Sequence, residues 1–463
     1  MKRLATVTIV AALIGTPAFA ADMAVKAPPP PPAPVYNWTG FYLGGTLGYS
    51  VGHDPATDIF SGSPTIDTAT VAPAGPVGGF EAGYNWQIDH WLIGIEGDWQ
   101  WMGQHDSWCL DCFPTIGRGI GQKLPWSATV RGRLGYAVGP VLFYTTGGAA
   151  FGKVETTINC CFNGTSATFD DQKSGWVFGA GIEAALVDNW SAKIEYLYLD
   201  LGNTTHTLGG FLTGTSEVRD HIFRAGLNYR FGAAQYQAAY VPNVLPVKAP
   251  ISAHLYNWTG FYAGGNFGYS VGRDPTLQSF AGVPNDQFTF APNGWLVGGQ
   301  VGYNWQISSL VLGLEGDAQW SGQKDTGLCR DCPPTAGFGY QLIEQKLPWF
   351  ATARGRIGYA AGPSLFYVTG GVAFTELRTA YSDAALPATF STTISNYKTG
   401  AAVGAGIEAA LFGNWTAKAE YLYLDFGAAT VSITGATEGP LTLSSQLRDN
   451  ILRAGLNYKF GAM

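Results

Sequence analysis

The segment Arg219-Asp-His-Ile-Phe-Arg-Ala-Gly-Leu-Asn-Tyr-Arg-Phe-Gly-Ala233 decides the fold class, because its side chains alternate between two kinds. Apolar residues occupy every second position, namely Phe223, Ala225, Leu227, Tyr229 and Phe231. The positions between them are polar or small, namely Arg224, Gly226, Asn228 and Arg230. A period of two places these sets on opposite faces of a β-strand. An apolar face toward lipid and a polar face toward a lumen are typical of a transmembrane barrel strand.

The same segment returns as Arg448-Asp-Asn-Ile-Leu-Arg-Ala-Gly-Leu-Asn-Tyr-Lys-Phe-Gly-Ala462, so the chain contains an internal duplication. Tyr36-Asn-Trp-Thr-Gly-Phe-Tyr42 likewise returns as Tyr256-Asn-Trp-Thr-Gly-Phe-Tyr262. A repeat this long indicates a duplicated domain and not a solenoid of short repeats. Residues that both copies retain can therefore be separated from residues that have drifted.

The N-terminal sequence predicts export. Lys2 and Arg3 precede an apolar stretch, and Ala18-Phe-Ala20 has the small-residue pattern of a cleavage site. We expect these segments along the chain: a signal peptide over 1–20, a proline-rich lead over 21–35, a first barrel over 36–233, a periplasmic linker over 234–255 and a second barrel over 256–463. Charged residues make up 13% of the chain and aromatic residues 14%, which fits a membrane barrel better than a soluble domain.

Each copy contains eight strand candidates, and tilted strands of ~9–11 residues suffice to cross a bilayer. In the first copy they are 38–51, 77–88, 91–101, 126–138, 141–151, 175–186, 190–201 and 221–231. The connections alternate between long (52–76, 102–125, 152–174 and 202–220) and short (89–90, 139–140 and 187–189). Long loops on one side and tight turns on the other are typical of outer-membrane barrels. We predict an all-β fold of two tandem eight-stranded antiparallel up-and-down transmembrane barrels, with one fused sixteen-stranded barrel as the alternative.

Further retained motifs are Gly179-Ala-Gly-Ile-Glu183, Lys193-Ile-Glu-Tyr-Leu-Tyr198 and the closing Leu227-Asn-Tyr-Arg-Phe231. With these motifs the chain resembles the small outer-membrane β-barrel proteins of alphaproteobacteria, often called outer-membrane immunogenic or surface-antigen proteins. The resemblance implies an eight-stranded barrel with surface-exposed loops. It also implies that a terminal aromatic closes each barrel, a role for which Phe231 and Phe460 are the candidates. The chain departs from the family in encoding two barrels and in placing Gly461-Ala-Met463 after Phe460.

Strand alternation directs nearly the same charged residues inward in both copies. In the first copy they are Glu81, Glu96, Asp98, Arg131, Arg133, Glu183, Lys193, Glu195, Arg224 and Arg230; in the second they are Glu315, Asp317, Arg354, Arg356, Glu408, Lys418, Glu420, Arg453 and Lys459. Gln300 takes the place of Glu81. An eight-stranded interior holds little more than side chains, and buried charges need partners. We therefore predict a salt-bridged network that either plugs the lumen or lines a narrow ion pathway.

Candidate reactive residues are few. Cys109-Leu-Asp-Cys112 and Cys329-Arg-Asp-Cys332 are matching Cys-x-x-Cys motifs in predicted loops. An oxidising, exported location favours local disulfides, and a four-cysteine zinc site or free thiols are the alternatives. No histidine keeps its matching position, as His53 corresponding to Arg273 illustrates. We expect no enzymatic activity, no metal site and no cofactor.

These patterns favour an integral protein in the outer membrane of a Gram-negative bacterium. We expect a structural, surface-exposed role in the envelope, with little or no transport. A passive porin-like channel for small solutes and loop-mediated binding of a ligand or host surface are the alternatives. Expected partners are outer-membrane lipid, lipopolysaccharide, and the secretion and barrel-assembly machinery. A formal charge of −7 without a basic patch argues against nucleic acid.

Overall fold

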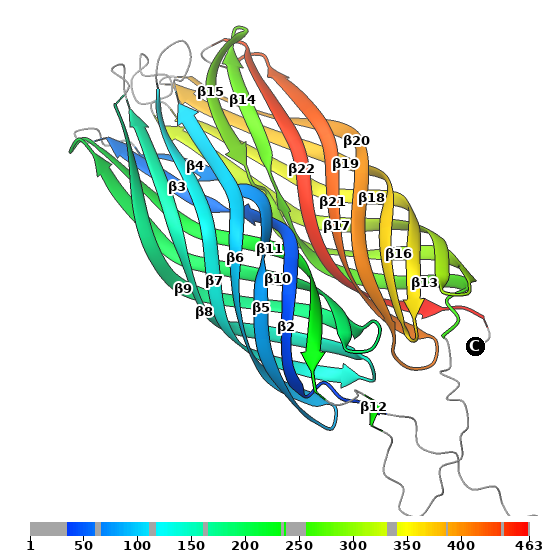
Figure 1. Ribbon diagram of the computed structural model, residues 1–463. Coiled ribbons are helices and arrows are strands. Elements are labelled where there is room, and N and C mark those ends of the chain that lie inside the picture. Colours follow the sequence, from blue (N-terminus) through cyan, green and yellow to red (C-terminus); the bar gives the residue numbers. More distant parts are fainter. Residues whose placement is uncertain are drawn as a thin grey trace, which may run out of the picture.

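The computed structural model describes residues 35–60, 66–110, 117–160, 165–232, 236–237, 256–330, 340–385, 388–436 and 439–461. All regular structure in these ranges is β-strand (Figure 1). Within them, no helix has the length and hydropathy needed to cross a bilayer. The predicted signal peptide lies outside the described residues, and so do the lead and the linker apart from β1 (Val35–Tyr36) and β12 (Tyr236–Gln237), which pair with each other.

Eight strands of the first copy form a closed antiparallel ring. In ring order they are β2 (Gly40–Gly52), β5 (Ala74–Ile88), β6 (Trp91–Leu110), β7 (Arg118–Val138), β8 (Val141–Cys160), β9 (Thr165–Ala185), β10 (Trp190–Leu208) and β11 (Leu212–Phe231). The last strand pairs with the first, with Phe231 opposite Phe41. This pairing closes the ring and leaves no sheet edge in the bilayer, where unpaired backbone groups would be costly.

The second copy forms an equivalent ring beside the first (Figure 1). Its strands are β13 (Gly260–Gly272), β16 (Asn293–Ile307), β17 (Leu310–Arg330), β18 (Tyr340–Ala361), β19 (Ser364–Ala385), β20 (Ala388–Ala410), β21 (Trp415–Ile433) and β22 (Leu441–Lys459). Pairing of β22 with β13 closes it. The prediction of two tandem eight-stranded barrels is confirmed.

The alternating pattern separates lipid-facing from luminal side chains. Leu47 and Phe80 on the outside are 75% and 73% exposed, whereas Glu81 and Arg131 on the inside are buried. An apolar outer face and a charged interior are the reverse of a soluble protein, and the bilayer explains the inversion.

The strands are longer than predicted, because they continue into the expected loops. Of the long connections expected over 102–125, 152–174 and 202–220, the described parts are largely strand: β6 reaches Leu110, β8 reaches Cys160 and β10 reaches Leu208. Threonine pairs support this extension on the outside, with Thr205 and Thr215 hydroxyls 3.1 Å apart. Hydrophobic alternation locates only the lipid-facing part of a strand, whereas backbone pairing persists where both faces are polar.

The 52–76 connection also forms strands, and these join the two barrels. They are the hairpin β3 (Asp54–Phe60) and β4 (Ile66–Val71), matched in the second copy by β14 (Asp274–Phe280) and β15 (Val283–Phe290). β3 pairs with β11 of its own barrel, but β4 pairs with β17 of the other barrel, with Thr68 opposite Leu328. Reciprocally, β14 pairs with β22, and β15 pairs with β6, with Gln287 opposite Cys109.

The two hairpins therefore exchange partners at the outer end. There the backbone pairing passes from β11 through β3 and β4 to β17, and from β22 through β14 and β15 to β6. Nearer the short turns, β2–β5 and β13–β16 pairing closes each barrel separately. Among the described strands, pairing of β9 with β10 ends at Trp176–Asp200 and pairing of β20 with β21 ends at Ala401–Asp425, so no closed sixteen-stranded ring forms at the outer end.

Below the junction, the lipid-facing sides of the two barrels pack against each other. Ile182 and Ile194 of the first barrel belong to one apolar cluster with Ile407 and Phe366 of the second. Aromatic rings extend this contact, with the Phe223 and Tyr421 centroids 5.4 Å apart. Side chains that look lipid-facing in the sequence are therefore buried between the barrels.

Candidate functional site: the barrel interiors and the outer junction

Arg131 on β7 lies at the centre of the first interior. Its guanidinium contacts the Glu96 carboxylate, and it lies 2.7 Å from Asp98 Oδ2 and 3.2 Å from Glu195 Oε1. The Arg131 side chain has no exposed surface. A single guanidinium thus contacts three carboxylates, because β6 and β10 both direct acidic side chains at it.

Lys193 and Arg224 complete this network from β10 and β11. Lys193 Nζ lies 2.7 Å from Glu81 Oε2 and 3.3 Å from Glu96 Oε2. Arg224 donates to Glu195, with a nitrogen–oxygen distance of 2.6 Å. Charge-assisted hydrogen bonds of this kind fix the side chains in one arrangement.

Arg133 forms a second centre with Glu183, at a nitrogen–oxygen distance of 2.5 Å. Its guanidinium lies 3.7 Å from the Tyr144 ring centroid, a cation–π geometry. Tyr42 donates its hydroxyl to Glu96 over 2.6 Å and crosses Gly83 to do so. A Cβ at Gly83 would lie 2.3 Å from the Tyr42 hydroxyl oxygen, so only glycine leaves room for this bond.

The second interior repeats the arrangement with one acid fewer. Arg354 lies 2.8 Å from Asp317, and Lys418 lies 2.8 Å from Glu315. The remaining pairs there are Arg453 with Glu420 at 2.6 Å and Arg356 with Glu408 at 2.9 Å. Gln300, in place of Glu81, donates to Asn457 Oδ1 over 2.8 Å. The carboxylate that distinguishes the first barrel is thus replaced by a neutral amide without loss of a hydrogen-bonded partner.

Arg230 and Lys459 are buried at the short-turn end, where they contact aromatic rings. The Arg230 guanidinium lies 4.2 Å from the Trp38 ring and 4.7 Å from the Tyr36 ring. Trp38 is fully buried beneath the barrel. It precedes β2, which begins at Gly40, whereas the predicted first strand begins at residue 38. Its backbone N–H donates to Gln87 over 2.6 Å. The retained Tyr-Asn-Trp-Thr motif therefore folds under the barrel and covers its end.

Three carboxylates of the first interior have the spacing of metal ligands. Oxygens of Glu81, Glu96 and Glu195 all lie within 4.8 Å of one another. The Lys193 ammonium lies within 3.5 Å of each of them. A protein cation thus already provides the positive charge that this cluster attracts, so the donor set gives no reason to infer a metal ion.

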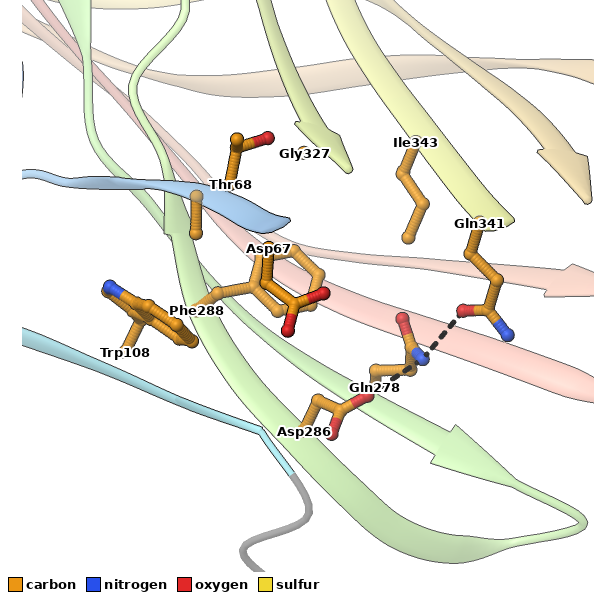
Figure 2. Close-up of a pocket in the computed structure, with 10 residues that line it drawn as sticks. Asp67, Thr68, Trp108, Gln278, Asp286, Phe288, Gly327, Gln341 and Ile343 are labelled. Atoms are coloured by element: carbon orange, nitrogen blue, oxygen red, sulfur yellow. Dashed lines mark hydrogen bonds between the residues drawn. The ribbon is translucent and has the colours of Figure 1, made fainter. Parts of the chain in front are cut away.

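The outer junction encloses a small cavity between the two copies (Figure 2). Its volume is about 40 Å³, and Asp67 and Trp108 of the first copy line it together with Gln278 and Asp286 of the second. Gln278 bridges Asp286 Oδ2, at 3.0 Å, and Gln341 Oε1, at 3.3 Å (Figure 2). Small-molecule sites typically have ~300–1,000 Å³, so this cavity is of water size.

An acidic pair beside this cavity differs between the copies. Asp58 lies opposite Asp67 on the β3–β4 hairpin, and Arg118 approaches Asp67 to 2.5 Å. Burial raises the pKa of the Asp58 carboxyl to about 7, and the Arg118 charge opposes that rise. In the second copy Gln278 occupies the position of Asp58, opposite Asp286. Like charges opposite each other destabilise a hairpin, and the second copy avoids them.

Two matching aspartates hold the exchanged hairpins together. Asp106 accepts a bond from the Ala72 N–H of its own copy, and its carboxylate lies 3.0 Å from Arg273 of the other. Arg273 also donates to the Ala72 carbonyl over 2.9 Å. We call Asp106, Ala72 and Arg273 the junction clasp. Asp325, the equivalent of Asp106, accepts from its own Ala291 N–H and from Thr70 of the first copy.

Asp106 and Asp325 were not among the candidate site residues predicted from the sequence. Both copies retain this aspartate in a segment in which several other residues differ, and that retention could have identified it from the sequence. Cys109, at the end of β6, is disulfide-bonded. Cys112 and Cys332 lie outside the described residues, so the predicted pairings Cys109–Cys112 and Cys329–Cys332 stay predictions.

Most of the chain matches one protein family, in two consecutive segments. The model of the outer membrane protein beta-barrel domain matches residues 8–231 and again 247–460. The chain belongs to this family. It is therefore an outer-membrane β-barrel protein, and the duplication inferred from the sequence corresponds to two copies of the family domain.

Individual relatives align with one half of the chain at a time. The 31 kDa outer-membrane immunogenic protein of Brucella melitensis is 38% identical over 235 residues, which are 48% of this chain and 97% of that protein. The 22 kDa outer membrane protein of Rhizobium leguminosarum bv. viciae is 32% identical over 43% of this chain and 82% of its own length. Among solved structures, Neisserial surface protein A is 14% identical, with a TM-score of 0.23, and the match covers 42% of this chain and 98% of that chain.

These relatives place the protein with surface immunogenic antigens of the Gram-negative outer membrane. Phe231 and Phe460 are both outward-facing, at 47% and 53% exposure, and each follows a tyrosine whose ring it contacts. Their role in barrel closure stays a prediction.

Proposed function

We propose that the protein is a structural, surface-exposed component of the outer membrane with little or no transport and no enzymatic activity. The observation that carries the proposal is the filling of both interiors by fixed ion pairs. Arg131 and its equivalent Arg354 are buried and ion-paired, as are the acids around them. A permeant ion would have to displace these pairs, and their rupture would leave buried charges without partners.

Apolar side chains between the charged network and the outer end of the barrel support the same proposal. Val77, Met102 and Leu124 belong to a buried cluster inside the first barrel. At the junction, Trp108 of the first copy packs with Phe288 and Phe290 of the second. Apolar side chains beyond the charged layer reduce the polar surface that an ion could follow.

Planar-bilayer recording of the refolded protein tests the proposal directly. We expect no steps, or only small flickering ones, under conditions in which a sixteen-stranded porin gives large stable steps. Large steps in the wild-type protein would favour the passive-channel alternative. Arg131→Met serves as a matched probe, because a true pathway through this network would change its conductance in that variant.

The envelope role is tested in cells. Deletion of the gene is expected to increase detergent sensitivity and vesicle release, because the envelope loses a folded structural component. Complementation with the full-length chain should restore both. Unchanged detergent sensitivity together with unchanged vesicle release would contradict the role. We include outer-membrane lipid, lipopolysaccharide and the barrel-assembly machinery among the proposed partners.

A further inference from the structure

An apolar groove lies between the two barrels, next to their packed contact. Its volume is about 920 Å³, within the range of ligand-binding sites. Leu47 and Leu227 of the first barrel form one wall, and Ile357 and Val368 of the second form the other. Ile194 and Ile407, which pack together in the barrel contact, also line the groove. The groove is thus continuous with the barrel contact.

The position of these side chains places the groove within the membrane. Leu47 and Leu227 are 75% and 51% exposed on the same outward face that carries the barrel's other lipid-facing residues. Ile357 and Val368 are 56% and 59% exposed on the equivalent face of the second barrel. Water is absent from hydrocarbon, so the groove must be filled by something apolar.

The short-turn end of the groove is polar. Ser308 and Ser309 lie in the turn between β16 and β17 and line that end. In outer-membrane barrels, short turns face the periplasm. Lys193 also contributes to the lining, but its ammonium group is directed into the lumen, where it binds Glu81. The groove therefore has an apolar body, a polar end at the periplasmic interface and no free charge among its described lining residues.

We propose that this groove is a binding site for one phospholipid of the periplasmic leaflet, with an acyl chain between the barrels. An acyl chain matches the apolar walls, and the serines lie where a headgroup would be. The neutral lining gives no preference between zwitterionic and anionic headgroups. The bound lipid exchanges more slowly than lipid on the open faces, because two barrels enclose it.

The test uses the full-length chain refolded in vesicles of equal parts palmitoyl-oleoyl phosphatidylethanolamine and phosphatidylglycerol. After extraction in mild detergent and gel filtration, phospholipid per chain is counted by mass spectrometry. Wild-type protein should retain about one phospholipid, with both headgroups represented equally. Retention of none would overturn the proposal. A strong preference for one headgroup would overturn the neutral-lining argument and with it this site.

Matched substitutions locate the lipid. Ala225 is exposed in the groove, and Ala225→Trp fills the space, so retained lipid should fall at least five-fold. Ala454 is the equivalent exposed residue outside the groove lining, and Ala454→Trp should leave retention unchanged. Gly45→Leu and Gly265→Leu form a second such pair, because a Cβ at either position meets only backbone at 3.8–3.9 Å. Equal losses within a pair would show nonspecific surface lipid and refute the site.

Discussion

Replacement of Arg131 by methionine removes the cation that serves three buried carboxylates. Methionine preserves most of the side-chain volume, so the change tests charge and not packing. Loss of one member of a buried ion pair typically destabilises a protein by ~3–5 kcal/mol, since the remaining charge has no partner. For a domain of this size, each kcal/mol shifts the unfolding temperature by ~2–4 °C, so the unfolding temperature of the first barrel should fall by about 6–20 °C.

The matched control is Glu81→Gln, which introduces the residue that Gln300 provides in the second barrel. Glu81 is one of three carboxylates around Lys193. Its neutralisation leaves Lys193 with two acidic partners, so stability should change by at most ~1 kcal/mol. Arg354→Met, the equivalent of Arg131→Met, should affect the second barrel by a similar amount.

The assay follows heat-induced unfolding of the refolded protein on sodium dodecyl sulfate gels, where folded barrels migrate faster. Two barrels need not unfold together, so a partly unfolded band is expected when only one network is broken. If Arg131→Met unfolds within 2 °C of wild type, the lost ion pairs contribute ~1 kcal/mol or less, which refutes the expected destabilisation. Equal destabilisation by Glu81→Gln and Arg131→Met would also refute it, because charge balance would then not govern the network.

Three further predictions concern the ends of the barrels. Arg273→Ala should loosen the junction clasp, so that the halves of a chain cleaved in its linker separate on a gel at lower temperature than cleaved wild-type halves; equal temperatures would exclude a clasp role. Asp58→Gln, which copies Gln278, should raise unfolding temperature at pH 8 but not at pH 4. The raised pKa of Asp58, about 7, means that its folded state holds a proton that the unfolded chain loses near pH 4, so wild-type stability falls as pH rises toward 7, by up to about 4 kcal/mol. The same pH response in Asp58→Gln would contradict this. Trp38→Ala should lower the free energy of unfolding by ~3–5 kcal/mol, as for other buried tryptophans, and an unchanged unfolding temperature would refute its covering role.

The physical pattern of the chain was sufficient to predict the rings. Alternation assigns each residue to a face, so Arg131, Glu96 and Lys193 could be placed in the lumen before any coordinates were known. Duplication added a control, because it separated retained Glu315 from drifted Gln300. Strand ends were less predictable, since β6 and β10 continue beyond the lipid-facing pattern on which the prediction rested.

The sequence by itself determined the fold class and which charged residues share a face of each strand, because a period of two is a local property. Only the tertiary structure decided which strands meet at the outer junction. β6 and β17 are matching strands of the two copies, and β4 pairs with β17, a choice that alternation within a strand does not specify. Contacts between distant residues, such as Arg273 with Asp106, select the exchanged arrangement. Local patterns fix orientation, whereas the choice of neighbour depends on the whole molecule.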